Sequence, residues 1–157
     1  MHVKSDQSST SSAPSQPVFS PDLPTASTWY FGLQSACALA ATLLVLGLFV
    51  GGAQPVAVGL FTEPWDKLAH AGVFSVLAVL MSVALRGAHL LHGRKFLNLS
   101  QTLVLAALLA MLVAGADEIH QIWLPGRSAD WGDWLADVVG VALGLLVVRW
   151  RCNYTDA

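Results

Sequence analysis

The sequence has little charge. Asp, Glu, Lys and Arg together make up 11% of its 157 residues, whereas a soluble domain carries about 25%. Hydrophobic residues account for 55%, and the mean hydropathy is +0.59. This composition excludes an ordinary water-soluble globule. The net charge of −2 also lacks the basic excess with which nucleic-acid-binding proteins hold phosphates, so no nucleic-acid partner is expected.

Cysteine is scarce as well. Cys37 and Cys152 are the two cysteines, and they do not form a CxxC pair. This spacing excludes both a disulfide framework and a zinc knuckle. HExxH, GxSxG and carboxylate-rich loops of fixed spacing are also missing from the sequence. No motif of fixed spacing therefore predicts a metal, a cofactor or a catalytic nucleophile, and we assign none.

Long apolar runs are the main feature that is present. A helix needs about 20 mostly apolar residues to cross a hydrocarbon core of ~30 Å. Four segments meet this length approximately, namely Trp29–Val50 and the stretches at about Trp65–Leu85, Leu97–Ala116 and Trp134–Trp150. All six tryptophans fall at the ends of these segments or between them, as in interfacial aromatic belts. The pattern predicts an all-α integral membrane protein, a four-helix bundle surrounded by lipid.

The chain divides into three parts. Residues 1–28 are rich in Ser, Thr and Pro and cannot bury enough apolar surface to form a core, so we expect a disordered tail. Residues 29–150 form the predicted four-helix membrane domain. Residues 151–157 form a short C-terminal tail.

Basic residues predict the orientation. One side of the membrane would collect Lys4, Arg86, Arg94, Lys95, Arg149 and Arg151, and the other side only Lys67 and Arg127. Because Lys and Arg are enriched in cytoplasmic loops, we expect both termini to be cytoplasmic in a multi-pass protein of the cell membrane. The stretches Gly51–Pro64 and Asp117–Asp133 would then face outward.

Acidic residues show the opposite bias. Seven of the ten carboxylates belong to the predicted outer side: Glu63, Asp66, Asp117, Glu118, Asp130, Asp133 and Asp137. Asp66 and His70 are i,i+4 and share one helix face. Asp130, Asp133 and Asp137 share another face if the fourth helix begins early enough. His70 and Asp137 would lie deepest, about one turn inside the membrane.

An ionisable group inside a membrane costs about 2.5–3.5 kcal/mol on insertion scales and usually faces a partner in the bundle. We therefore predict a polar cluster at the outer side that acts as a binding site: Asp66, Lys67, His70, Glu118, Gln121, Arg127, Asp130, Asp133 and Asp137. One alternative is that this network only holds the helices together. Another alternative is a metal held by His70 with Asp66, Glu118 and Asp133, and with His120 as a second imidazole.

Small residues recur at intervals of four in the fourth segment, at Ala136, Gly140 and Gly144. This spacing allows two membrane helices to approach closely. We expect packing within the chain rather than dimerisation, and the third segment offers a matching surface at Ala106, Ala110 and Ala114.

The polar positions resemble a known family. Asp66-Lys67-x-x-His70 is similar to the DKxxH signature of VanZ-like membrane proteins. The second signature of that family, ExxQ…PGRxxDxxD, is matched by Glu118, Gln121, Pro125, Gly126, Arg127, Asp130 and Asp133. Gly140 and Gly144 fit its closing glycines, and the resemblance covers about residues 29–150. The family usually has Asn where this chain has Asp137, which adds a charge and removes an amide donor.

The resemblance implies a four-helix membrane architecture and a role in the cell envelope. The family is similar to the accessory protein linked to low-level teicoplanin resistance. The resemblance does not imply a chemical reaction. We expect a membrane protein that is not an enzyme and that binds an envelope lipid or a glycopeptide-type amphiphile, lowering susceptibility to lipophilic glycopeptides. One alternative is a small intramembrane enzyme that acts on a lipid-linked envelope intermediate with His70 as acid/base. The other is a purely structural helical partner, and the oligomeric state stays open.

Overall fold

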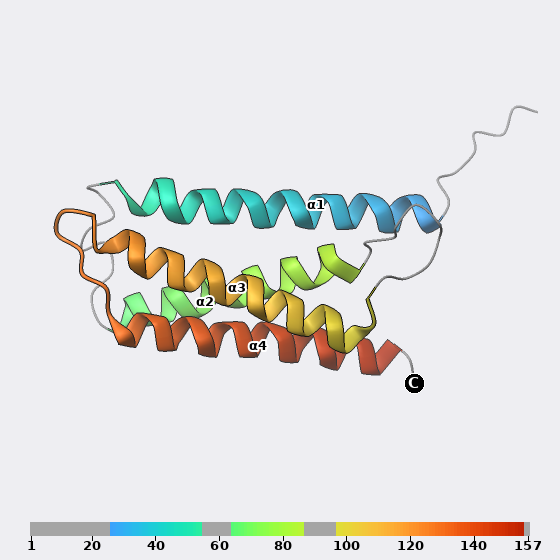
Figure 1. Cartoon of the computed structure of the whole chain (residues 1–157). Coiled ribbons are helices and arrows are strands. Elements are labelled where there is room, and N and C mark those ends of the chain that lie inside the picture. Colours follow the sequence, from blue (N-terminus) through green and yellow to red (C-terminus); the bar gives the residue numbers. More distant parts are fainter. Residues whose placement is uncertain (1–25, 55–63, 87–96, 156–157) are drawn as a thin grey trace, which may run out of the picture.

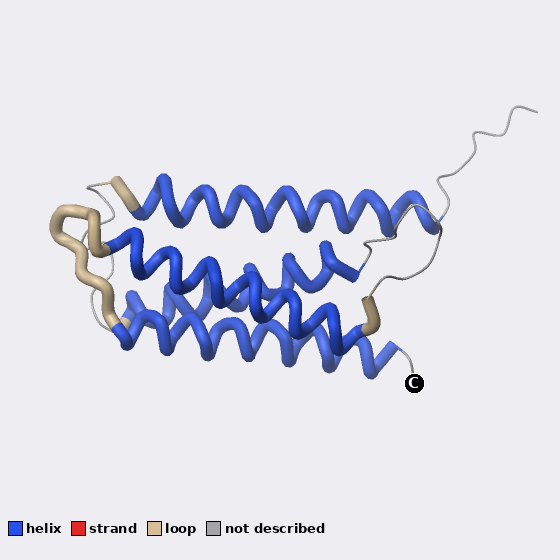
Figure 2. Tube along the Cα trace, viewed as in Figure 1, coloured by secondary structure: helices blue, strands red, loops and turns tan. Residues whose placement is uncertain are grey.

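The computed structural model describes residues 26–54, 64–86 and 97–155, which form four long helices (Figure 1). The elements are α1 (Ala26–Leu46), its π-helical continuation η1 (Gly47–Gly51), α2 (Trp65–Arg86), α3 (Leu99–Gln121) and α4 (Trp131–Thr155). These three ranges contain helices, turns and loops and no strand (Figure 2). The predicted all-α class with four helices is confirmed.

Each helix is long and apolar enough to cross a membrane: the spans are Trp29–Gly51, Trp65–Arg86, Leu99–Gln121 and Trp131–Tyr154. Large apolar side chains point outward on all four helices, for example Leu39, Leu68, Leu112 and Leu143. In water such exposure would be costly, but in a bilayer the lipid tails cover these side chains. The chain is a multi-pass membrane protein.

Successive helices run in alternating directions along the bundle (Figure 1). One end of the bundle therefore gathers η1, the start of α2, the end of α3 and the start of α4. The start of α1 and the C-terminus lie at the other end. The most extensive helix contact joins α2 to α4, which are not consecutive in the chain.

Two helices are longer than the sequence predicted at the end of the bundle where α3 ends and α4 begins. Helix α3 ends at Gln121 instead of Ala116, and α4 begins at Trp131 instead of Trp134. A helix that began at Trp134 would have Asp137 in its first turn, but α4 begins earlier and Asp137 lies in its second turn. Hydropathy alone stopped both segments at the first charged residues, although these residues are paired within the bundle and continue the helices.

The other helix ends differ by a few residues. Helix α3 begins at Leu99 rather than Leu97 because Asn98 caps it: Asn98 Oδ1 accepts from the backbone N–H of Gln101, and Gln101 Oε1 accepts from the N–H of Asn98. Helix α1 already starts at Ala26, so the last residues of the tail predicted to be disordered are helical. Helix α4 likewise continues to Thr155, through most of the predicted C-terminal tail.

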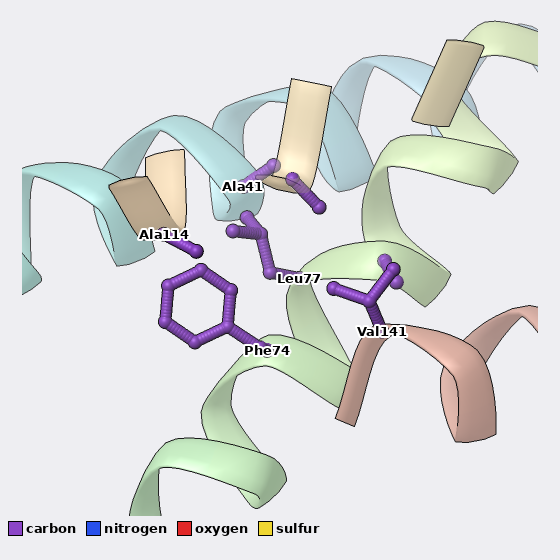
Figure 3. Packing of buried hydrophobic residues seen from close by; sticks show 7 residues of the cluster. Ala41, Phe74, Leu77, Ala114 and Val141 are labelled. Atoms are coloured by element: carbon purple, nitrogen blue, oxygen red, sulfur yellow. The ribbon is translucent and has the colours of Figure 1, made fainter. Parts of the chain in front are cut away.

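Buried apolar side chains from all four helices meet in the middle of the bundle. Ala41 of α1, Phe74 and Leu77 of α2, Ala114 of α3 and Val141 of α4 belong to one cluster (Figure 3). Phe74, Leu77 and Ala114 are fully buried. This cluster ties the otherwise lipid-facing helices together and fixes which face of each helix points inward.

The glycines of α4 pack against α2. A Cβ at Gly140 would overlap the carbonyl group of Ala71, and one at Gly144 would overlap the carbonyl group of Ser75. The predicted packing within the chain is thus confirmed, but the predicted partner surface on the third segment is wrong. Two of the alanines of α3, Ala110 and Ala114, belong instead to the apolar cluster with Phe74 and Leu77.

Some predictions concern residues outside the described ranges. These are residues 1–25 of the tail with Lys4, the greater part of the first outward loop with Glu63, and the basic positions Arg94 and Lys95.

Candidate functional site

The polar residues lie at the end of the bundle where α2 begins, α3 ends and α4 begins (Figure 1). The 122–130 connection passes over this end between α3 and α4. We call this region the polar end. Its charged side chains come from three helices and from the connection, as the sequence predicted from their spacing.

Lys67 is the basic centre of the exposed part of the polar end. Its Nζ atom lies 3.2 Å from Asp130 Oδ2, 3.5 Å from Asp133 Oδ1 and 3.8 Å from Asp66 Oδ2. One ammonium group therefore faces three carboxylates from α2, α4 and the loop before α4. This arrangement confirms that Lys67 partners the acidic residues.

Asp130 begins α4. Its Oδ1 accepts from the backbone N–H of Gly132 at 2.8 Å, and its carbonyl oxygen accepts from the N–H of Trp134 at 3.2 Å. Such a cap satisfies N–H groups that have no partner inside the helix. The hydrogen bond from Gly132, and then the one from Lys67, hold the pKa of Asp130 below its ordinary value.

His70 and Asp137 meet deeper in the bundle. His70 Nδ1 lies 2.9 Å from Asp137 Oδ1, within hydrogen-bond distance, and the Asp137 side chain is fully buried. The two residues come from α2 and α4, the helices with the most extensive contact. The sequence had paired His70 with Asp66 by helical spacing, but the partner of its imidazole is on another helix.

Glu118 connects the loop to the buried part. Its Oε2 accepts from the backbone N–H of Asp130 at 3.0 Å. Its other oxygen, Oε1, is buried without a hydrogen-bond partner, and so is Oδ2 of Asp137. Two buried carboxylates thus each have one oxygen in a hydrogen bond and one oxygen without any.

Gln121 pairs with a residue that the sequence reasoning left out of the site. Its Nε2 donates to Asp117 Oδ2 at 3.0 Å, and both residues are buried. The ExxQ signature had grouped Gln121 with Glu118, three positions earlier in the chain. The i,i+4 spacing of Asp117 and Gln121 was the signal that could have identified Asp117.

The Pro-Gly-Arg segment forms a tight turn. The backbone N–H of Arg127 donates to the carbonyl oxygen of Leu124 at 3.2 Å, and Gly126 has φ of 79°. Proline at the second position and a positive φ at the third are the features of a type II turn, which favours glycine there. The turn brings Arg127, which is partly buried, to the polar end.

A cavity of about 500 Å³ opens beside this network. It lies between the end of α3, the connection and the start of α4, and it is lined by Glu118, Ile119, Ile122, Ala129, Asp130, Trp131 and Trp134. Most of the lining is apolar, and carboxylate groups come only from Glu118 and Asp130. The cavity can therefore accept an apolar group whose polar end meets two carboxylates.

Within the described ranges, one group of side chains could hold a metal ion: His70, Glu118 and Asp137. One potential ligand atom from each lies within 4.8 Å of the other two. The donors Asp66, Asp133 and His120 suggested by the sequence are not part of this group. Asp66 and Asp133 face Lys67 instead, and the His120 ring packs on Phe49 with centroids 5.2 Å apart.

The structure thus divides the nine predicted site residues into layers. Asp66, Lys67, Asp130 and Asp133 form the charged outer layer. His70, Glu118 and Asp137 form the inner layer, in which the two carboxylates are buried and His70 is partly buried. Gln121 bonds to Asp117, and Arg127 lies in the Pro-Gly-Arg turn of the connection.

Comparison with known proteins agrees with the resemblance seen in the sequence. The VanZ/LLP1 family profile matches residues 4–151. No curated protein and no solved structure gives a significant match. Since the profile covers nearly the whole chain, including all four helices and the polar end, the chain belongs to the VanZ/LLP1 family.

Proposed function

We propose that the polar end binds an amphiphile of the cell envelope, and that this binding lowers susceptibility to lipophilic glycopeptide antibiotics. The observation that carries the proposal is the cavity of about 500 Å³ between α3 and α4, which is apolar except for Glu118 and Asp130. Ligand sites are typically concave and apolar, with a few polar groups that fix orientation. An acyl chain or another apolar group would occupy the cavity.

The charges define the other half of the ligand. Besides Glu118 and Asp130, the polar end carries Asp66, Asp117, Asp133 and Asp137, against the basic residues Lys67 and Arg127. Carboxylates accept hydrogen bonds and repel anions. The favoured head group therefore carries amines, amides or hydroxyls, as a lipophilic glycopeptide does.

Tryptophans support a location at the membrane surface. Trp131 and Trp134 line the cavity, and their rings lie edge to face with centroids 5.9 Å apart. Tryptophan is enriched at membrane–water interfaces. An amphiphile would there keep its apolar part in the bilayer and present its head to the polar end.

The proposal places the polar end outside the cell and both termini in the cytoplasm. Arg86, Arg149 and Arg151 lie toward the opposite end of the bundle. Lys and Arg near span ends are enriched on the cytoplasmic side, which supports this orientation.

Binding can be tested by filling the cavity. Ala129 is exposed in the connection and lines the cavity, so Ala129→Trp should occlude it. Ala116, exposed on α3 and outside the lining, provides the control variant Ala116→Trp. We expect Ala129→Trp to weaken binding of a lipoglycopeptide to the purified protein in nanodiscs at least about tenfold, ~1.4 kcal/mol, and Ala116→Trp to leave it unchanged.

The same variants should also be tested for antibiotic susceptibility in cells that express them at the wild-type level. Ala129→Trp should restore susceptibility to the lipoglycopeptide, with little effect on a glycopeptide that lacks the acyl chain. Equal binding and equal susceptibility for both variants and the wild type would contradict the proposal.

A second function is favoured by the His70–Asp137 pair. A carboxylate that orients an imidazole is a common arrangement for acid–base catalysis, and these two groups lie 2.9 Å apart. The corresponding activity would be turnover of a lipid-linked envelope intermediate. Purified wild-type protein should then convert such a substrate and His70→Gln should not, whereas no turnover by the wild type would count against an enzyme.

A further inference from the structure

Three helices each contribute one metal-ligating side chain to the same buried point. His70 comes from the second turn of α2, Glu118 from the last turn of α3 and Asp137 from the second turn of α4. Their potential ligand atoms lie within 4.8 Å of one another. Because the residues are far apart in the sequence, no motif of fixed spacing reveals the group.

The unpaired oxygens point to something that this group binds. Glu118 and Asp137 are 8% and 0% exposed, and Oε1 of the first and Oδ2 of the second have no hydrogen-bond partner. A buried polar atom without a partner is destabilising, and buried carboxylates are normally paired or bound to a metal. Lys67, the basic residue of the outer layer, faces the three outer carboxylates.

The remaining oxygens of the two carboxylates are held in place. Glu118 Oε2 accepts from the N–H of Asp130, and Asp137 Oδ1 contacts His70 Nδ1. Hydrogen bonds of this kind orient metal ligands, and residues around metal sites commonly supply them. The two side chains are therefore fixed with one free oxygen each.

The donor set indicates the class of ion. Carboxylate oxygens alone suit magnesium and calcium, whereas an imidazole beside them suits first-row transition ions. Catalytic zinc is typically held by three protein ligands, with the fourth position left open. We propose that His70, Glu118 and Asp137 bind one zinc ion, with Glu118 Oε1, Asp137 Oδ2 and one His70 nitrogen as ligands.

Zinc binding at this site does not require that an amphiphile occupies the cavity. Its three residues are needed whether or not the cavity is filled, and only Glu118 is shared with the cavity lining. The Ala129→Trp variant should thus retain zinc affinity even where it abolishes amphiphile binding. A negative result for amphiphile binding therefore does not contradict zinc binding, and a negative result for zinc does not contradict amphiphile binding.

The test uses the full chain, purified without chelator in detergent, and zinc as the only probe. Metal analysis and titration against a chromophoric chelator should give one zinc per wild-type chain. His70→Ala, Glu118→Gln and Asp137→Asn should each lower the affinity by more than the roughly 10- to 100-fold lost with an outer partner of a metal ligand.

Matched controls separate this site from the other acidic and imidazole groups. Asp133→Asn changes a carboxylate one turn from Asp137 on the same helix, and His120→Ala changes the imidazole that packs on Phe49. Both should keep the wild-type affinity, and zinc should raise their unfolding temperature as it raises that of the wild type. The ligand variants should show no zinc-dependent rise.

A measurement on the wild type alone covers the case in which ligand variants do not fold. Cobalt(II) at a site of low coordination number should give intense visible absorption that zinc removes. Weak absorption typical of six oxygen ligands, an absence of zinc, or equal zinc affinity in the ligand and control variants would overturn the proposal. Ordinary surface carboxylates would then explain any metal that binds.

Discussion

The imidazole of His70 and the carboxylate of Asp137 lie 2.9 Å apart, although 67 positions separate them in the chain. The close approach of their helices makes this contact possible. Ala71 follows His70, Gly140 lies one turn after Asp137, and there is no room for a side chain between the Ala71 carbonyl and Gly140. Gly140 therefore allows α2 and α4 to come close enough for the His70 imidazole to contact the Asp137 carboxylate.

Substitution of Gly140 should separate these helices. Gly140→Ala places a methyl group on the Ala71 carbonyl, and we expect a loss of about 1–3 kcal/mol, as for other overpacked cores. Gly115→Ala is the matched control, because a Cβ there meets nothing within 4 Å. Unfolding temperatures in detergent measure both, and an equal effect of the two changes would argue against close packing at Gly140.

Lys67 should contribute more to stability than a basic residue at the opposite end. Lys67→Met leaves Asp66, Asp130 and the nearly buried Asp133 without their shared ammonium group. We expect a loss of about 1 kcal/mol, because solvent screens the more exposed pairs and only Asp133 is nearly buried. Arg149→Met, at an exposed position of α4, should have little effect on the unfolding temperature. A similar shift for both variants would contradict the role given to Lys67.

Asp130 should make stability sensitive to acid. Its pKa is lowered in the folded protein, first by the Gly132 N–H and then by Lys67. A lowered pKa in the folded state means that the stabilisation is present above the ordinary value of 3.8 and is lost as the pH falls through the folded value. Unfolding temperatures measured from pH 7 downward should therefore fall more steeply for the wild type than for Asp130→Asn. Parallel curves would show that this carboxylate does not carry the effect.

Reporter fusions test the orientation. A reporter in the loop between Gln54 and Glu63 should report an outside location, whereas reporters near Gly93 and after Ala157 should report the cytoplasm. The reason is the concentration of Lys and Arg near the two latter sites. The reverse pattern would place the polar end in the cytoplasm, and an antibiotic-facing role would then be wrong.

Hydropathy and tryptophan placement predicted four helices because these signals depend on length and composition alone. They failed at the helix ends near the polar end. Charged residues there lower the hydropathy, yet Asp130 caps α4 and Asp117 bonds to Gln121 within α3. Such pairing lowers the free-energy cost of burying a charge, but an average of residue hydropathies does not account for it.

The membership of the polar cluster was predictable, but its pairing was not. Helical spacing relates residues on one helix, so it identified the shared face of Asp66 and His70. Helical spacing does not predict how α2 is rotated relative to α4, and this rotation brings His70 into contact with Asp137. For the same reason the sequence suggested α3 as the surface for Gly140 and Gly144, which pack on α2.

The two oxygens of Glu118 lie in different environments. One accepts from the Asp130 amide beside the cavity, and the other is buried without a partner. Since both belong to one rigid carboxylate, a ligand that draws Oε2 away from Asp130 also moves Oε1. For such a ligand, occupancy of the cavity and zinc binding by His70, Glu118 and Asp137 would be thermodynamically linked, and each would alter the affinity of the other by the same factor.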